Sequence, residues 1–354
     1  MIRLLVCWVG FVWFVFSRGD GQVLLFVSEY STGNIRGYDF SGSSGVEVSL
    51  PPGYTPVGGS TAGADGMVVA ADGRMYVNRD GGGIYRRSAD GQSFALFTTI
   101  AGSPTLLDLT ANTTHLFSAS FGTNVIYQTD LTTGMYSSIV GPVGSVRFDG
   151  VRIGPDGRLY VVDSSNGNIF AYDLASSSWS TFLISSLPGD ASQMEFAGDD
   201  VYVSRTVGGE ARIYRYTLNV SGNYALGLNP LSETLIGSLG MGTATGIRIG
   251  PDGRLYANNF NTGEIWRSNV GITAMEATAY ISGLSYPGSI YFSVIPEVSR
   301  GWFGLLVLVG VVVKRLCSRG VGCGKVCWAG VGRLGVWGLC REEEDCGFEC
   351  GRVV

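Results

Sequence analysis

Between residues 22 and 298 the chain has no lysine and no cysteine, and the whole 354-residue sequence has a single histidine, His115. Without cysteine, this segment has no thiol nucleophile and no disulfide framework. One histidine argues against a Ser-His-Asp triad and against a metal site built from histidines. Gly81, Gly82 and Gly83 join two expected strands and open no helix, so no phosphate-binding or dinucleotide motif is present.

Positive charge is also scarce in this segment. It carries 14 arginines against 23 aspartates and glutamates, a net charge of −9. Proteins that bind nucleic acid or anionic lipid present clustered basic residues. We therefore expect neither nucleic acid nor an anionic lipid surface as a partner.

A repeated phrase shows how the segment is built. Residues 153–160 and 249–256 both read IGPDGRLY, and residues 69–76 read VAADGRMY. Pro-Asp-Gly between short apolar runs predicts the turn of a β-hairpin, with glycine supplying positive φ at Gly157 and Gly253. His115 occupies the corresponding turn position of another hairpin, so we interpret it as structural.

Degenerate copies of the hairpin extend the repeat to six units, marked by one aromatic residue in each second strand. These anchors recur at intervals of 41 to 54 residues, a period typical of propeller blades. The anchors are Phe26, Tyr76, Phe117, Tyr160, Tyr202 and Tyr256.

The two ends of the repeat array complete each other. The first unit begins at its second strand, residues 24–28, and residues 289–293 form an orphan first strand. Pairing them removes the edges that a linear array would expose. We predict an all-β fold, a six-bladed β-propeller over residues 22–295 closed by joining the N- and C-terminal strands in one blade. The alternatives are an open solenoid and a β-sandwich.

The N-terminus has the features of an export signal. Met1-Ile2-Arg3 precedes an apolar run over residues 4–16, which is short for a membrane span. We predict a signal peptide over residues 1–21; an uncleaved anchor is the alternative.

Residues 296–319 resemble the PEP-CTERM sorting tail. Pro296 and Glu297 precede an apolar run over residues 301–313, followed by Lys314 and Arg315. The resemblance implies export in a Gram-negative bacterium, transient inner-membrane anchoring, and cleavage near Pro296-Glu297 by an exosortase-type protease. Basic residues after the run favour a cytoplasmic end, leaving the propeller outside. The alternative is an ordinary single-span anchor.

The remaining residues, 320–354, form a cysteine-rich tail. Cys323 and Cys327, and Cys346 and Cys350, are spaced as loose pairs without a histidine. Zinc sites favour closer pairs, often with histidine. We expect the tail to be disordered and functionally inert; a zinc site is the alternative.

Propeller topology gathers several polar residues on one face. The innermost strand of each blade leaves this face and the second strand returns to it. Residues that begin the first strand and residues that end the second therefore share the face. This predicts a binding face at the central channel composed of Asp65, Asp149, Thr245, Glu29, Asp163, Arg79, Arg205 and Asn259.

Two segments resemble blades of the NHL-repeat and gluconolactonase-like group: Asp65-Gly66 with residues 72–77, and Asp149-Gly150 with residues 160–163. The resemblance implies a six-bladed propeller with a divalent metal, such as Ca²⁺, held by Asp65 and Asp149. The alternative is that Asp65 and Asp149 bind no metal and form turns at the starts of their strands. Two functions follow: an exported, non-enzymatic binding module for an unidentified ligand or surface polymer, and a metal-dependent lactonase-like hydrolase.

Overall fold

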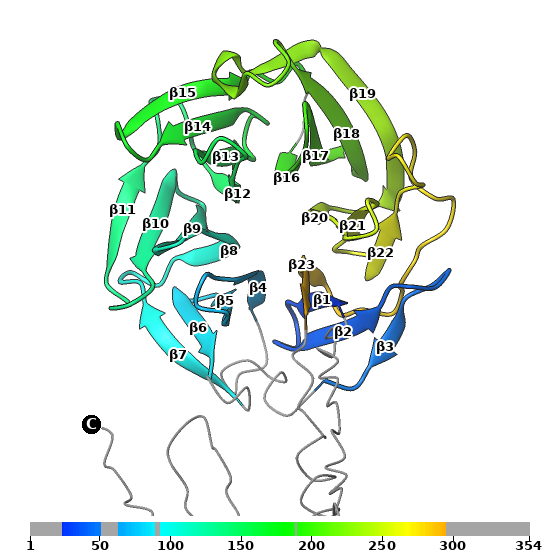
Figure 1. The fold of residues 1–354 in the computed structure, drawn as a ribbon, viewed down its shortest axis with the longest axis horizontal. Coiled ribbons are helices and arrows are strands. Elements are labelled where there is room, and N and C mark those ends of the chain that lie inside the picture. Colours follow the sequence, from blue (N-terminus) through cyan, green and yellow to red (C-terminus); the bar gives the residue numbers. More distant parts are fainter. Residues whose placement is uncertain (1–22, 51–62, 89–92, 188–189, 295–354) are drawn as a thin grey trace, which may run out of the picture. The chain divides into compact units, whose positions relative to one another are not determined.

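The computed structural model describes residues 23–50, 63–88, 93–187 and 190–294. The predicted signal peptide, the sorting motif of Pro296, Glu297, Lys314 and Arg315, and the cysteine-rich tail lie outside the described residues. In the described part, strands form six small antiparallel sheets arranged in a ring (Figure 1). The predicted six-bladed β-propeller is confirmed. No helix in this part is long and apolar enough to cross a membrane.

Blade 1 joins the two ends of the propeller, in the sheet order β23-β1-β2-β3. β1 pairs antiparallel with β23 from Val23 opposite Val294 to Glu29 opposite Pro287. The predicted closure is therefore confirmed. The strands are β23 (Pro287–Val294), β1 (Val23–Glu29), β2 (Ile35–Asp39) and β3 (Val46–Val48).

Blades 2, 3 and 4 follow in chain order, each with four strands. Blade 2 contains β4 (Ala64–Val69), β5 (Met75–Arg79), β6 (Gly83–Arg87) and β7 (Phe94–Thr99). Blade 3 contains β8 (Thr105–Ala111), β9 (His115–Phe121), β10 (Val125–Asp130) and β11 (Tyr136–Val140). Blade 4 contains β12 (Phe148–Ile153), β13 (Leu159–Asp163), β14 (Ile169–Asp173) and β15 (Ser178–Leu183).

Blades 5 and 6 depart from this regularity. Blade 5 has long outer strands, with the 3₁₀ helix η2 (Tyr224–Leu226) between them. Blade 6 has three strands; a loop continues its sheet through an isolated bridge from Ile265 to Ile281. The strands are β16 (Asp190–Ala197), β17 (Asp200–Val207), β18 (Glu210–Leu218), β19 (Leu228–Met241), β20 (Ala244–Ile249), β21 (Leu255–Asn259) and β22 (Glu264–Arg267).

The repeated phrase closes its own turn. Asp156 accepts hydrogen bonds from the Arg158 amide at 3.2 Å and from the Tyr160 hydroxyl at 2.9 Å. Tyr76 and Tyr256 donate in the same way to the aspartates four residues before them, both at 2.8 Å. Gly157 and Gly253 have φ of 79° and 72°. Their predicted positive φ is confirmed, and the Asp–Tyr pairs explain why both residue types recur.

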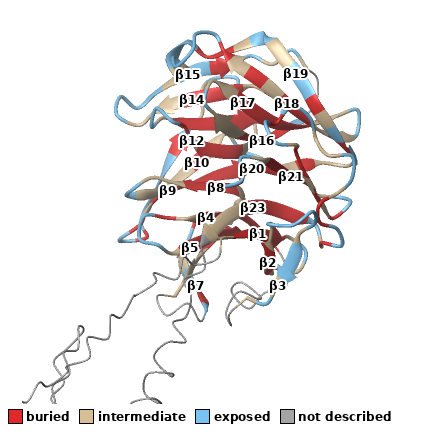
Figure 2. Cartoon of the chain, turned by 45° about the vertical axis from the view of Figure 1, so that its right-hand side comes forward, coloured by how far each residue is buried: buried red, intermediate tan, exposed pale blue. Residues whose placement is uncertain are grey.

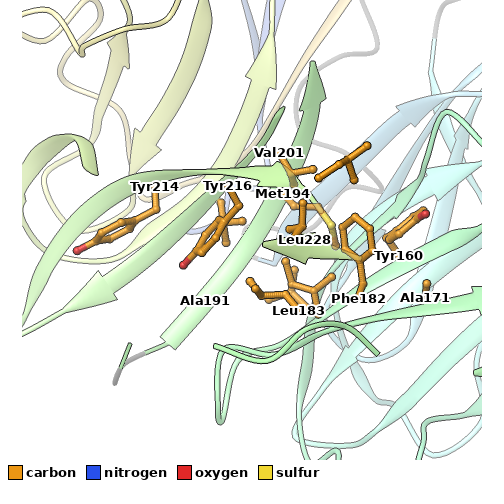
Figure 3. Close-up of a cluster of buried hydrophobic side chains, with 14 residues drawn as sticks. Tyr160, Ala171, Phe182, Leu183, Ala191, Met194, Val201, Tyr214, Tyr216 and Leu228 are labelled. Carbon is orange, nitrogen blue, oxygen red and sulfur yellow. The ribbon is translucent and has the colours of Figure 1, made fainter. Parts of the chain in front are cut away.

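The core lies between neighbouring blades. Tyr160, Phe182 and Leu183 of blade 4 pack against Met194 and Tyr216 of blade 5 (Figure 3). Burial follows the inner and middle strands, whereas the outer strand β3 is mostly exposed (Figure 2). The alternating apolar residues of each blade are therefore buried against the next blade, and the innermost strands β4, β8, β12, β16, β20 and β23 face the centre of the ring (Figure 1).

Candidate functional site

Every innermost strand carries an irregularity at the same place. In blade 4, Phe148 lies opposite Asp163 and Val151 opposite Val161, so one extra residue is accommodated on the inner strand. The other blades show the same register shift. Such β-bulges re-aim side chains and are frequent beside active sites. The bulged positions are residues 65–66, 107–108, 149–150, 192–193, 245–246 and 288–289.

Polar side chains on the second strands stabilise three of these bulges. A bulge frees a backbone amide from the ladder, and a buried amide requires a hydrogen-bond partner. The Ser289 amide donates to Ser28 Oγ at 2.8 Å. The Gln193 amide donates to Ser204 Oγ at 2.9 Å, and Asn258 accepts similarly in blade 6.

The bulges of neighbouring blades are tightly packed. A Cβ atom on Gly150 would lie 2.3 Å from the Ser192 carbonyl oxygen, and one on Gly66 would lie 2.4 Å from the Leu107 carbonyl oxygen. Only glycine permits this approach of two backbones. The Asp-Gly pairs of the sequence therefore combine a polar residue with a contact between blades.

The structure brings Asp65 and Asp149 together and adds Asp108. Asp65 and Asp149 hold the first bulged position of blades 2 and 4, and Asp108 holds the second in blade 3. Burial, followed by the charges of Asp149 and Asp108, raises the pKa of Asp65 well above its usual range. Burial, followed by the charge of Asp108, raises the pKa of Asp149 to about 8. Burial and the repulsion between neighbouring acids therefore disfavour the ionised form of both carboxyl groups when no cation is near.

This shift predicts a pH-dependent stability. An aspartate in an unfolded chain ionises at a pKa of about 4, whereas folded Asp149 holds its proton to about pH 8. The unfolded state then binds fewer protons, so the contribution of Asp149 becomes less favourable as pH rises from about 4 to about 8. We expect the Tm of Asp149→Asn to rise relative to that of the wild type over this interval. Parallel pH profiles of the two proteins in thermal melts would contradict the assignment.

The residues that end the second strands occupy a different position from the one expected. Glu29, Asp163, Arg205 and Asn259 are fully buried. We therefore correct the expectation that they form an accessible binding face. Their side chains are covered by loops, mostly from the preceding blade, that the sequence pattern does not place.

Their partners show a role in joining blades. Asp163 accepts hydrogen bonds from the amides of Val146 at 3.0 Å and Arg147 at 3.3 Å. Arg205 donates to the Gly167 carbonyl at 2.8 Å, and Asn259 to the Leu239 and Met241 carbonyls, both at 3.0 Å. Glu29 accepts from the Ser285 amide at 2.9 Å and pairs with Arg36 at 3.1 Å.

The last two predicted residues, Thr245 and Arg79, also have their side chains engaged by other residues of the propeller. The hydroxyl of Thr245 donates to the Pro287 carbonyl at 3.1 Å, which links blade 6 to blade 1. Arg79 is buried, with its guanidinium 5.3 Å from the ring centre of Tyr85. Asp65, which is also buried, and Asp149, which is half-buried, are the predicted acidic residues that lie at the inner-strand bulges, and we take them as the candidate site.

An aromatic group that sequence reasoning missed lies beside Asp65. The rings of Tyr30 and Phe260 are 5.8 Å apart, and those of Phe260 and Tyr286 are 5.1 Å apart. The Tyr30 hydroxyl donates to Asp80. This hydrogen bond, then burial and the charges of Asp80 and Asp65, raises the pKa of Tyr30 to about 12. Tyr30 and Phe260 directly follow the ends of β1 and β21, and Tyr286 directly precedes β23; these positions at strand ends are the signal that could have located the group.

Metal ligation was the sequence expectation for Asp65 and Asp149. Among the described residues, no group of three or more histidine, cysteine, aspartate or glutamate side chains is arranged to hold a metal ion. Ca²⁺ takes six to eight oxygen ligands. The donor set on these bulges therefore does not fit a protein-built Ca²⁺ site.

Comparison with known proteins gives the fold. The sequence matches no family profile and no curated protein. Virginiamycin B lyase from Staphylococcus aureus is similar in structure, with a TM-score of 0.53 and 16% identity over 76% of this chain and 87% of that one. A chain of the nidogen/laminin complex is similar with a TM-score of 0.57 and 12% identity, covering 78% and 99%. At these identities the likeness establishes a six-bladed β-propeller and leaves the narrower NHL and gluconolactonase resemblance a prediction.

Proposed function

We propose that this protein is an exported, non-enzymatic binding module that recognises a cationic group of a partner at the mouth of its central channel. One observation carries the proposal: Asp65 and Asp149 lie at equivalent inner-strand bulges and interact electrostatically, and Tyr30, which packs with Phe260 and Tyr286, is close enough to feel the charge of Asp65. Export rests on the signal-like residues 1–21 and the sorting-like residues 296–319.

Carboxylates next to aromatic faces attract ammonium and guanidinium groups. A cation bound between Asp65 and Asp149 offsets the repulsion that raises their pKa values and so favours their ionised form. The carboxylate charge and the ring quadrupole then act on the cation in the same direction, and each gains strength in a partly dehydrated site. Tyr286 is 47% exposed, so a ligand can reach its ring. The net charge of −9 between residues 22 and 298 draws basic partners toward the surface.

Backbone strain marks the same place. Tyr286 has a φ of 53°, in the left-handed region that a bulky residue rarely adopts. Its carbonyl accepts the Tyr30 amide at 2.9 Å, which fixes one aromatic residue against the other. Strained residues gather at binding sites, where the surrounding structure maintains them.

Fluorescence anisotropy with labelled peptides tests this function. We expect peptides with a central lysine, arginine or trimethyllysine to bind and a glutamate peptide not to bind. Tyr286→Ala and the double variant Asp65→Asn, Asp149→Asn should weaken binding about tenfold or more, equivalent to about 1.4 kcal/mol. Leu231→Ala is the matched control, because this side chain is 93% exposed on the distant β19. Equal binding of the glutamate peptide, or wild-type affinity in the variants, would overturn the proposal.

The lactonase-like hydrolase is the second candidate, favoured by the pKa of Asp149. A carboxyl group with a pKa of about 8 is suited to proton transfer near neutral pH. The lyase named above shares the fold, and a shared fold does not transfer activity. We expect millimolar Ca²⁺ to leave the Tm unchanged. A Tm increase that Asp149→Asn abolishes would instead support the metal-dependent hydrolase, because a ligand bound to the folded state stabilises it.

A further inference from the structure

A second set of channel residues lies deeper than the mouth, opposite the six aromatic anchors. In blades 4, 5 and 6, the inner-strand residues paired with the anchors are Arg152, Glu195 and Arg248. The other three blades contribute only uncharged groups, Tyr291, Val68 and Thr110. Charge in this layer is therefore concentrated on three consecutive blades.

The two guanidinium groups converge on one carboxylate. Glu195 Oε2 lies 3.5 Å from Arg248 Nη1 and 3.9 Å from Arg152 Nε. Both arginines are more than nine-tenths buried, with exposed fractions of 8% for Arg152 and 7% for Arg248. Arg248 also lies over the ring of Tyr291, at 5.8 Å from its centre.

Their hydrogen-bonding capacity is largely unused. Within the described residues, Arg152 Nε donates to the Met194 carbonyl and Arg248 Nη1 to the Ile247 carbonyl, both at 3.2 Å. The Nη2 atoms of both arginines are buried without a hydrogen-bond partner there. A guanidinium carries several N–H donors, and a buried donor left unpaired is destabilising.

The nearby carboxylates do not fill this need. Asp108 Oδ2 is 3.8 Å from Arg152 Nη2, beyond hydrogen-bond distance, and accepts the Val151 amide at 3.0 Å instead. Glu195 Oε1 accepts the Phe196 amide at 3.3 Å. One oxygen of each carboxylate is thus held by a backbone amide, and neither carboxylate forms a hydrogen bond with the Nη2 atoms of the two arginines.

We propose that Arg152 and Arg248 form a binding site for a small diffusible oxyanion, a phosphate or a carboxylate, inside the channel. The planar guanidinium fork suits the oxygens of these anions. The arginines stand one residue before the ends of β12 and β20, so the site lies toward the Pro-Asp-Gly turns and away from the mouth. Their burial excludes a large partner surface, and the occupant is therefore a small molecule.

The surrounding acids regulate this site. Burial raises the pKa of Glu195 and of Asp108, while the Arg152 charge opposes both shifts. Each proton taken up by either acid removes a negative charge that competes with the bound anion. The other charged or titratable groups of this layer are Arg152, Arg248 and the Tyr291 hydroxyl, and the charge of Asp108 also acts on Asp65 and Asp149 at the mouth. Affinity for the anion should therefore rise as pH falls.

Isothermal titration of the full chain with inorganic phosphate, and separately with succinate, tests the proposal at constant ionic strength. We expect saturable binding of at least one of them, weakened about tenfold or more in Arg248→Met. Arg74→Met is the matched control, since Arg74 is an ion-paired arginine of a turn on the same side of the ring. The titration with phosphate tests for a phosphate ligand, and the titration with succinate tests for a carboxylate ligand.

Glu195→Gln keeps the test decisive if an arginine variant fails to fold. A binding site predicts tighter phosphate or succinate binding in this variant, because a competing charge is removed and both arginines remain. A purely structural ion-pair network predicts lower stability without any anion binding. Absence of saturable binding in both the wild type and Glu195→Gln would overturn the proposal, as would equal loss of binding in Arg74→Met.

Discussion

A chain that stops at Tyr286 will lose the cooperative unfolding transition of the propeller. Removing β23 leaves β1 as an open edge and removes Ile290, which is fully buried opposite Val27. Deleting one buried isoleucine side chain costs about 2–5 kcal/mol. The strand also accepts the Thr245 hydroxyl of blade 6 and donates its Ser289 amide to Ser28 within blade 1. The sum approaches the whole stability of a typical domain, about 5–15 kcal/mol.

Circular dichroism melts compare this chain with one that stops at Val294 and keeps the strand. The longer chain should retain a single sharp transition. Ile290→Asp in the full chain offers an independent route, because it buries an unpaired charge without shortening the protein. If the chain ending at Tyr286 melts as sharply and at the same temperature as the control, the ring does not depend on closure.

The second large effect is expected from the smallest substitution, Gly150→Ala. The added Cβ would lie 2.3 Å from the Ser192 carbonyl oxygen, where the bulges of blades 4 and 5 meet. Neither backbone can move without disturbing its own sheet. Overpacking typically costs about 1–3 kcal/mol of folding stability and occasionally more. Because the added Cβ would meet a backbone atom and not a flexible side chain, we expect a loss at the upper end of this range. Urea unfolding at equilibrium measures the change.

Gly157→Ala, seven residues later, is the matched control. Gly157 has a φ of 79°, and an added Cβ would meet nothing within 4 Å. Its penalty is conformational only and should be about 1 kcal/mol. The two glycines thus separate steric contact from backbone strain. Equal losses of stability in the two variants would contradict the close packing of the bulges.

Comparison of the blade repeats within the sequence did not identify Asp108 as a residue of the site. In blades 2 and 4 the acid precedes a glycine, as Asp65-Gly66 and Asp149-Gly150, whereas blade 3 places Asp108 at the glycine position. The bulge changes which residues face the channel, so a shift of one residue moves a side chain into a different environment. Aligning Leu109 with Met67 and Val151 would have found it.

The sequence alone determined the six blades, the turns and the closing strand. These features depend on residues close together in the chain, such as Asp156 and Tyr160 within one turn, and on an apolar alternation that repeats six times. Tertiary structure decided the site. Arg205 is buried because Gly167 of the preceding blade covers it, and Arg152, Glu195 and Arg248 meet because three inner strands converge. Contacts between blades join residues far apart in sequence, and no local pattern records them.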